Sequence, residues 1–165
     1  DERPRYEPGR LLRENPDNPS DRLMMIPVLE DIGDAAFLQS HCFRYAGLER
    51  DKGSATHRID FFPVSSLKKS DIEGSFFLDT GSFVVRRATF RMTRPEQFNL
   101  SLRDVLVTTN YREVFPGVTV IGDVVSVQTV GGASPLAKTL RLTEKQHLLD
   151  FTFLGAKPGD ASIKR

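Results

Sequence analysis

A short turn between two runs of strand-forming residues constrains the fold of this chain most strongly. The runs Gly74–Asp79 and Ser82–Met92 are rich in β-branched and aromatic residues, and they flank Thr80 and Gly81. A short turn between two such runs predicts a β-hairpin. A third run of this kind, Thr56–Phe62, precedes them and ends at a proline. We therefore expect three consecutive antiparallel strands.

Similar strand patterns continue through the rest of the chain. Further strands are expected at Phe43–Gly47, Val105–Tyr111, Val118–Val130, Lys138–Leu142 and Leu148–Leu154. A helical turn over Thr143–Leu149, with Thr143 as its cap, is the alternative near the end. Pro116 and Gly117 predict a turn, and Gly122 predicts a bulge. Short connections between so many strands predict an all-β or β-dominated α+β fold with a curved, half-barrel-like antiparallel sheet.

Prolines and one stretch of helical periodicity divide the N-terminal part of the chain. Residues 1–22 contain four prolines among charged residues, which predicts an extended arm that packs at most as a strap. Leu29–Gln39 has apolar residues at near-helical spacing and predicts one short helix, which Gly33 interrupts. We expect a single β-rich domain over 23–156, with its sheet wrapped around this helix or around a ligand, and a flexible tail over 157–165.

Charge and cysteine content exclude several classes of protein. The chain has 165 residues, of which 23 are basic and 22 acidic, so it lacks the basic excess of a nucleic-acid-binding surface. Hydrophobic residues make up 39%, which argues against a disordered chain, and no apolar run reaches the ~18 residues of a membrane-spanning helix. Because Cys42 is the only cysteine, no intrachain disulfide is expected. We therefore expect neither a nucleic-acid partner nor a membrane span.

His41 and Cys42 form the most reactive-looking pair in the sequence. A neighbouring imidazole can activate a thiol as a nucleophile, but adjacent residues on a strand point to opposite faces. We therefore expect Cys42 to be buried and unreactive, as a free cysteine usually is. The histidines His41, His57 and His147 have no spacing typical of metal ligands. No catalytic residue, metal site or cofactor is predicted.

Arginines on successive strands are candidates for binding an anionic group. They would form a basic stripe if the strand register aligned them, and they are Arg86, Arg87, Arg91, Arg103 and Arg112. The alternative is an exposed sheet face on which arginines pair with Glu73, Glu96 and Glu113. Single ion pairs of that kind contribute little to stability.

Three segments between Cys42 and Pro95 resemble known families. The segments CFRYAG, HRIDFFP and DIEGSFFLDTGSFVVRRATFRMTRP resemble bacterial outer-membrane-associated proteins of unassigned function that carry a carboxypeptidase-regulatory-like domain. The strands HRIDFFP and GSFFLD, with the RR strand that follows, are also similar to lipoprotein carriers of the LolA/LolB kind. That resemblance implies an open half-barrel with helices on its concave face, an internal lipid site, and a location in the periplasm or at the outer membrane. The chain differs from those carriers because it begins with a proline-rich arm in place of a long amphipathic helix.

The phenylalanines of the central strands are the expected ligand-binding residues. Phe61, Phe76 and Phe90 would line an apolar site if the concave face were open, and they would form a core if it were filled. With the resemblance, they predict a non-catalytic binding module of the bacterial cell envelope that holds a lipid or another apolar ligand, with an envelope protein as a further partner. A structural or interaction module of a larger outer-membrane or surface protein is the alternative, and an enzyme is a distant one.

Overall fold

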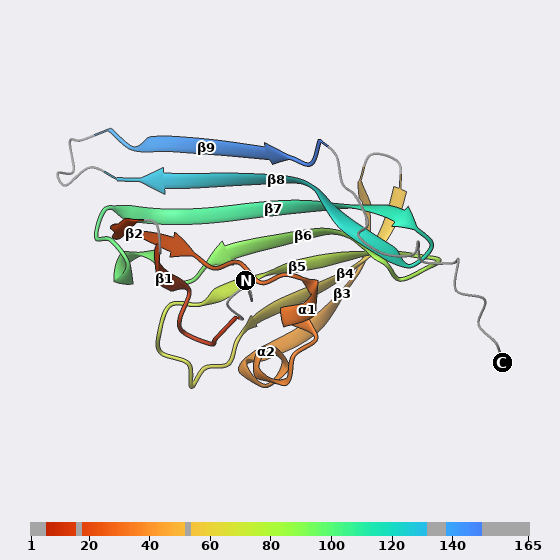
Figure 1. Ribbon diagram of the computed structural model, residues 1–165. Coiled ribbons are helices and arrows are strands. Elements are labelled where there is room, and N and C mark those ends of the chain that lie inside the picture. The colour runs from red at the N-terminus through yellow and green to blue at the C-terminus, as the bar shows by residue number, and fades with distance from the viewer. Residues whose placement is uncertain (1–5, 16–17, 52–53, 132–137, 150–165) are drawn as a thin grey trace.

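The computed structural model describes residues 6–15, 18–51, 54–131 and 138–149. Its elements are β1 (Leu12–Asn15), β2 (Asn18–Met24), α1 (Leu29–Ile32), α2 (Ala35–Ser40), β3 (His41–Asp51), β4 (Ser54–Pro63), β5 (Ile72–Asp79), β6 (Val85–Met92), the 3₁₀ helix η1 (Pro95–Gln97), β7 (Leu102–Phe115), β8 (Val118–Val130) and β9 (Leu140–His147). Strands β3 to β9 form one open antiparallel sheet in chain order, and β1 and β2 form a separate hairpin (Figure 1). The β-dominated antiparallel fold is therefore confirmed.

The three central strands are confirmed, but the connection between the second and third is longer than predicted. Strands β4, β5 and β6 are neighbours and antiparallel. The connection from β5 to β6 is a five-residue loop over 80–84, because the Asp79 carboxylate accepts hydrogen bonds from the backbone of Gly81 (3.0 Å) and Ser82 (2.9 Å). The hydrogen bond from the backbone of Ser82 lowers the pKa of Asp79 most, and the hydrogen bond from Gly81 lowers it further. A side chain that hydrogen-bonds the backbone ahead of it stabilises a wider turn than a two-residue hairpin.

Strands β7 and β8 follow their sequence pattern closely. Alternate residues of β7, namely Val105, Val107 and Thr109, are buried. The turn lies at Pro116-Gly117, and Gly117 has a φ of 78°, which a glycine adopts readily. Strand pairing passes directly from Asp123 to Ile121, so Gly122 is the extra residue of a bulge. Both the turn and the bulge are confirmed.

Strand β9, the last strand described, contradicts the helical turn that was the alternative prediction for this part of the chain. Residues 143–147 belong to β9, so the helical turn over Thr143–Leu149 is wrong. Strand pairing with β8 explains this outcome, because it satisfies the backbone groups that a helical turn would have bonded internally. The strand expected over Leu148–Leu154 extends beyond residue 149 and lies largely outside the described residues, as does the tail expected over 157–165.

The N-terminal segment, residues 6–40, contributes more to the fold than a strap would. Tyr6 and Leu11 belong to the buried core, at 7% and 1% exposure. The predicted single helix is two short helices, α1 and α2, with Gly33 between them. The side chain of Asp34 caps α2 by accepting a hydrogen bond from the backbone of Ala36 (2.8 Å). Helix α2 packs against the sheet through Phe37, as one of the two expectations for this side of the sheet had it.

The core lies between the N-terminal segment and one face of strands β4 to β7 (Figure 1). It consists of Tyr6, Leu11, Phe37, Phe61, Ile72, Phe76, Ala88, Phe90, Met92, Val105 and Val107. We call this side of the sheet the core face and the opposite side, which carries Asp60 and Ser75, the outer face. A side chain at Gly74 would place its Cβ 1.8 Å from the backbone oxygen of Thr89, so the close approach of β5 and β6 requires glycine there. No helix in the described part of the chain is long and apolar enough to span a membrane.

Candidate functional site

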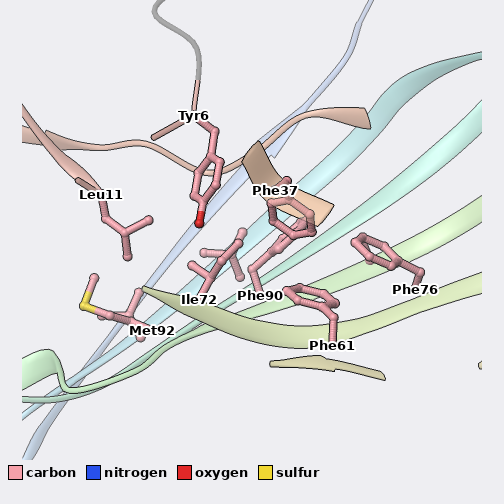
Figure 2. Close-up of a cluster of buried hydrophobic side chains, with 11 residues drawn as sticks. Tyr6, Leu11, Phe37, Phe61, Ile72, Phe76, Phe90 and Met92 are labelled. Carbon is pink, nitrogen blue, oxygen red and sulfur yellow. The ribbon is translucent and has the colours of Figure 1, made fainter. Parts of the chain in front are cut away.

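The three predicted ligand-binding residues meet in the core. Phe61, Phe76 and Phe90 come from three adjacent strands and are 1%, 5% and 2% exposed. The rings of Phe61 and Phe76 stack at 4.7 Å, and Phe90 lies about equally far from both, at 6.0 and 6.1 Å (Figure 2). Phe37 of α2 covers them, with its ring 5.6 Å from that of Phe61. The sequence therefore located a real aromatic cluster, and the N-terminal segment fills the space in front of it.

A buried carboxylate holds the N-terminal segment against the sheet. Asp71 is fully buried and accepts hydrogen bonds from the Tyr6 hydroxyl (2.7 Å) and from the backbone of Gly9 (2.8 Å) and Ile72 (2.8 Å). Burial raises the pKa of Tyr6 well above its usual value, and the hydrogen bond to Asp71 raises it further. Sequence reasoning missed this contact, because 65 residues separate its partners and no local pattern connects them.

His41 is part of the same structural unit. Its side chain is fully buried, and its two ring nitrogens lie 3.1 Å from the backbone oxygens of Phe37 and Ile72. Its ring also stacks on that of Phe37 at 4.1 Å. These contacts tie the end of α2 to the start of β5, which is a structural role for this histidine.

The expected burial of Cys42 is wrong. Cys42 is exposed, whereas its neighbour His41 is buried. Adjacent residues of β3 point to opposite faces, so the thiol lies on the outer face, where the N-terminal segment does not pack. The same alternation separates the imidazole from the thiol, as expected for adjacent residues of a strand.

A group of large side chains is exposed on the core face near the β3 edge. We call it the aromatic patch, and it consists of the exposed residues Phe43, Tyr45, Leu48 and Phe83 together with the half-buried His57. Tyr45, Leu48 and Phe83 are 60%, 65% and 62% exposed, and Phe43 is 40% exposed. Strand pairing places Phe43 opposite Phe61 and Leu48 opposite His57, so the patch continues the core face beyond the area that the N-terminal segment covers. Contiguous exposed apolar surface of this kind is typical of binding sites.

The loop between β5 and β6 completes the aromatic patch at an energetic cost. Phe83 has a φ of 57°, a left-handed conformation that bulky residues rarely adopt. Its ring stacks on His57, at 5.4 Å and 8° between ring planes, and the Tyr45 hydroxyl lies 2.9 Å from Nδ1 of His57. Unfavourable backbone geometry at an exposed aromatic residue is a feature of functional surfaces.

The outer face is dominated by ion pairs around Asp60. This carboxylate accepts hydrogen bonds from Arg58 Nε (2.7 Å), Arg44 Nη2 (2.8 Å) and Ser75 Oγ (2.8 Å). Burial alone would raise its pKa, but the hydrogen bonds from Arg44, Ser75 and Arg58 together lower it to about 2. Asp60 therefore stays ionised and holds the two guanidinium groups in place.

The predicted basic stripe is largely neutralised. Three of its arginines pair with carboxylates, namely Arg86 with Glu113 at 3.0 Å, Arg87 with Glu49 at 3.5 Å and Arg91 with Asp104 at 3.2 Å. Arg87 also lies 3.9 Å above the ring of Phe77. Of the three glutamates expected as partners, Glu113 forms such a pair, and its pKa is lowered mainly by a hydrogen bond from the backbone of Gly117. The ion-paired face is the arrangement found.

Two grooves lie beside these ion pairs. One, of about 320 Å³, is lined by Arg44, Asp60 and Phe62, and the other, of about 480 Å³, is lined by Phe77 and Arg87. A more apolar groove of about 360 Å³ lies where α1 meets the bulged part of β8, and it is lined by Leu29, Tyr111 and Ile121 among others. Burial, followed by the charge of Glu30, raises the pKa of Tyr111 to about 12. Tyr111 therefore stays protonated at neutral pH.

The described histidines are dispersed over the fold. His41 and His147 lie on the two opposite edge strands, and His57 belongs to the aromatic patch. Within residues 6–15, 18–51, 54–131 and 138–149, no three His, Cys, Asp or Glu side chains are grouped closely enough to hold a metal ion.

Comparison with known proteins adds no family to this description. No protein-family model matches the chain, and no curated protein or solved structure matches it significantly. Function is therefore argued from the geometry of the aromatic patch and the core.

Proposed function

We propose that this chain is a non-catalytic binding module of the bacterial cell envelope that holds a lipid or another apolar ligand on the aromatic patch. The observation that carries the proposal is the exposure of Phe43, Tyr45, Leu48 and Phe83 near the β3 edge of the core face, where Tyr45 and Phe83 both contact His57. Isolated exposed apolar residues need no explanation, but a group that shares one face of a sheet does. The assignment to the envelope is supported by the sequence resemblance alone.

Non-catalytic action is supported by the contacts of the reactive side chains. The ring nitrogens of His41 lie against backbone carbonyls, and Cys42 faces away from it. Asp60 and Asp71 are engaged by hydrogen bonds that hold the fold together. Catalytic groups need a nucleophile, an acid or a base that converges on a substrate site, and these residues serve packing and strand pairing.

A titration with a fluorescent fatty-acid probe tests the proposal. The unmodified protein should bind the probe saturably at micromolar concentration. The double variant Tyr45→Ala/Phe83→Ala should bind it about tenfold more weakly or worse, because two exposed rings of the patch are removed. Phe62→Ala is the matched control, since Phe62 is 42% exposed but lies on the outer face. The affinity of this variant for the probe should equal that of the unmodified protein.

The predicted site at Phe61, Phe76 and Phe90 requires a separate measurement, because these rings also support the core. A ligand that reaches them must displace α2, which covers them through Phe37. Phe76→Ala should then lower probe affinity by more than its loss of stability accounts for. An effect equal to the stability loss would limit the ligand to the aromatic patch.

A structural or interaction module of a larger outer-membrane or surface protein is the second candidate. The observation that favours it is the filled core face, in which Phe37 packs on Phe61 and His41. If the unmodified protein shows no saturable binding of the probe at micromolar concentration, the lipid-binding proposal fails and this second candidate replaces it.

A further inference from the structure

Strand β9 is an edge strand that the described part of the protein leaves uncovered. It pairs only with β8 in the sheet order, and all eight of its residues are exposed (Figure 1). An edge strand presents a row of backbone N–H and C=O groups that can bind another strand. Its free edge is therefore a template for strand addition.

The two faces of β9 differ in chemistry. On the core face, Leu140 and Leu142 are 57% and 48% exposed and lie beside Val130 and Gln128 of β8. On the outer face, Arg141 and Lys145 flank Thr143, and no carboxylate of the described residues pairs with either cation. A strand that adds to this edge meets Leu140 and Leu142, followed by Glu144 and Gln146, on one side and the positive charges of Arg141 and Lys145 on the other.

A second copy of the chain does not fit this edge. Two antiparallel β9 strands related by a twofold axis at Thr143 would place Arg141 opposite Lys145 of the second copy. An axis at Glu144 would place that carboxylate opposite itself, and an axis at Leu142 would pair only 140–144. Like charges directly opposite each other destabilise a strand pair. Electrostatics therefore disfavours self-association along the full strand.

We propose that β9 binds an extended segment of another protein in which acidic and apolar residues alternate. Backbone hydrogen bonds would supply affinity, as in other cases of strand addition, and side chains on alternate faces would supply specificity. Acidic residues of the partner lie opposite Arg141 and Lys145, and apolar residues lie opposite Leu140 and Leu142. The edge of the sheet that carries β9 is opposite the edge that carries the aromatic patch, so this inference does not depend on the proposed function.

Fluorescence anisotropy with labelled eight-residue peptides tests the proposal on the full chain. The probe peptide carries Glu at the positions facing Arg141 and Lys145, Leu at those facing Leu140 and Leu142, and Thr elsewhere. The control peptide has Lys in place of Glu. The Glu peptide should bind saturably, about tenfold or more tighter than the Lys peptide, and more weakly as salt is added.

The variant R141E/K145E provides the matched test of charge. It should reverse the preference between the two peptides while circular dichroism shows an unchanged fold, because both side chains are exposed. Two further peptides carry N-methyl groups at alternate positions, either all odd or all even. Strand addition predicts that one of them loses binding and the other keeps it, since only alternate N–H groups of an antiparallel edge point at its partner.

Three results would overturn the proposal. The first is a lack of saturable binding by the Glu peptide. The second is equal binding of that peptide to R141E/K145E, and the third is equal binding of the two N-methylated peptides. If, in addition, R141S/K145S associates with itself at high concentration in analytical ultracentrifugation, the two cations protect the edge from aggregation and do not recruit a partner.

Discussion

The two halves of the sheet differ in what covers them, although their strands are built in the same way. Strands β4 to β7 carry the sheet residues of the buried core, and they pack beneath the N-terminal segment. Strand β8 is at best half-buried along its length, and β9 is exposed throughout. The valine-rich sequence of β8 is typical of a buried strand, although its side chains are not fully buried here. Covering segments, and not strand composition, therefore determine which part of this sheet is a core.

This comparison predicts that truncations in the two halves have very different effects. Phe37→Ala should reduce the free energy of unfolding by about 3–5 kcal/mol, because it empties the fully buried contact between α2 and the sheet. Leu142→Ala in β9 should reduce it by less than about 0.5 kcal/mol, because the side chain is already 48% exposed. Urea unfolding monitored by circular dichroism measures both. Similar losses for the two variants would mean that β9 is covered in solution.

The same contrast applies to glycines in the two halves. Gly74→Ala should cost about 3 kcal/mol, since its Cβ would lie 1.8 Å from the backbone oxygen of Thr89 and β5 would have to separate from β6. Gly122→Ala is the control in β8, where the nearest atom to the added Cβ is 3.4 Å away, and it should cost less than about 1 kcal/mol. Thermal unfolding of the two variants side by side decides between a local clash and a general intolerance of alanine.

The hydrogen bonds of Asp71, which anchor the N-terminal segment, should make the next largest contribution to the free energy of unfolding. Asp71→Asn should destabilise the protein by about 2–3 kcal/mol, because an amide NH₂ replaces one of the oxygens that accept from Tyr6 and Gly9. Tyr6→Phe should cost about 1 kcal/mol, since it removes a single hydrogen bond. Limited proteolysis should also cleave the N-terminal segment faster in Asp71→Asn. Unchanged cleavage would show that apolar packing alone holds this segment.

Lowering the pH should weaken the ion pairs of Asp60 with Arg44 and Arg58 on the outer face of the sheet. The pKa of Asp60 is about 2 in the folded protein and 3.8 for an ordinary aspartate, so its contribution to stability is complete above pH 4 and is lost as the pH falls toward 2. The expected loss is about 2 kcal/mol. Asp60→Asn should be less stable at neutral pH and should lack this part of the acid dependence. If the free energy of unfolding fell equally between pH 4 and pH 2 in the unmodified protein and in Asp60→Asn, this assignment to Asp60 would be contradicted.

Local pattern alone was sufficient for much of the sheet. Alternation identified the strands near β4, β5, β6 and β7, and it placed β8 at Val118–Val130, as observed. The turn at Pro116-Gly117 and the bulge at Gly122 were also readable, because both depend on the backbone preferences of single residues. The grouping of Phe61, Phe76 and Phe90 was expected from the phenylalanine-rich strands together with the family resemblance, and the three rings do lie together.

Only the tertiary structure decided which surfaces are buried. Strand alternation shows that His41 and Cys42 point to opposite faces, but the docking of the N-terminal segment determines that the histidine is buried and the thiol exposed. The contact between Tyr6 and Asp71 joins residues 65 positions apart, and the aromatic patch forms where that segment ends its coverage. Secondary structure follows from neighbouring residues, whereas burial depends on long-range packing, which no local pattern encodes.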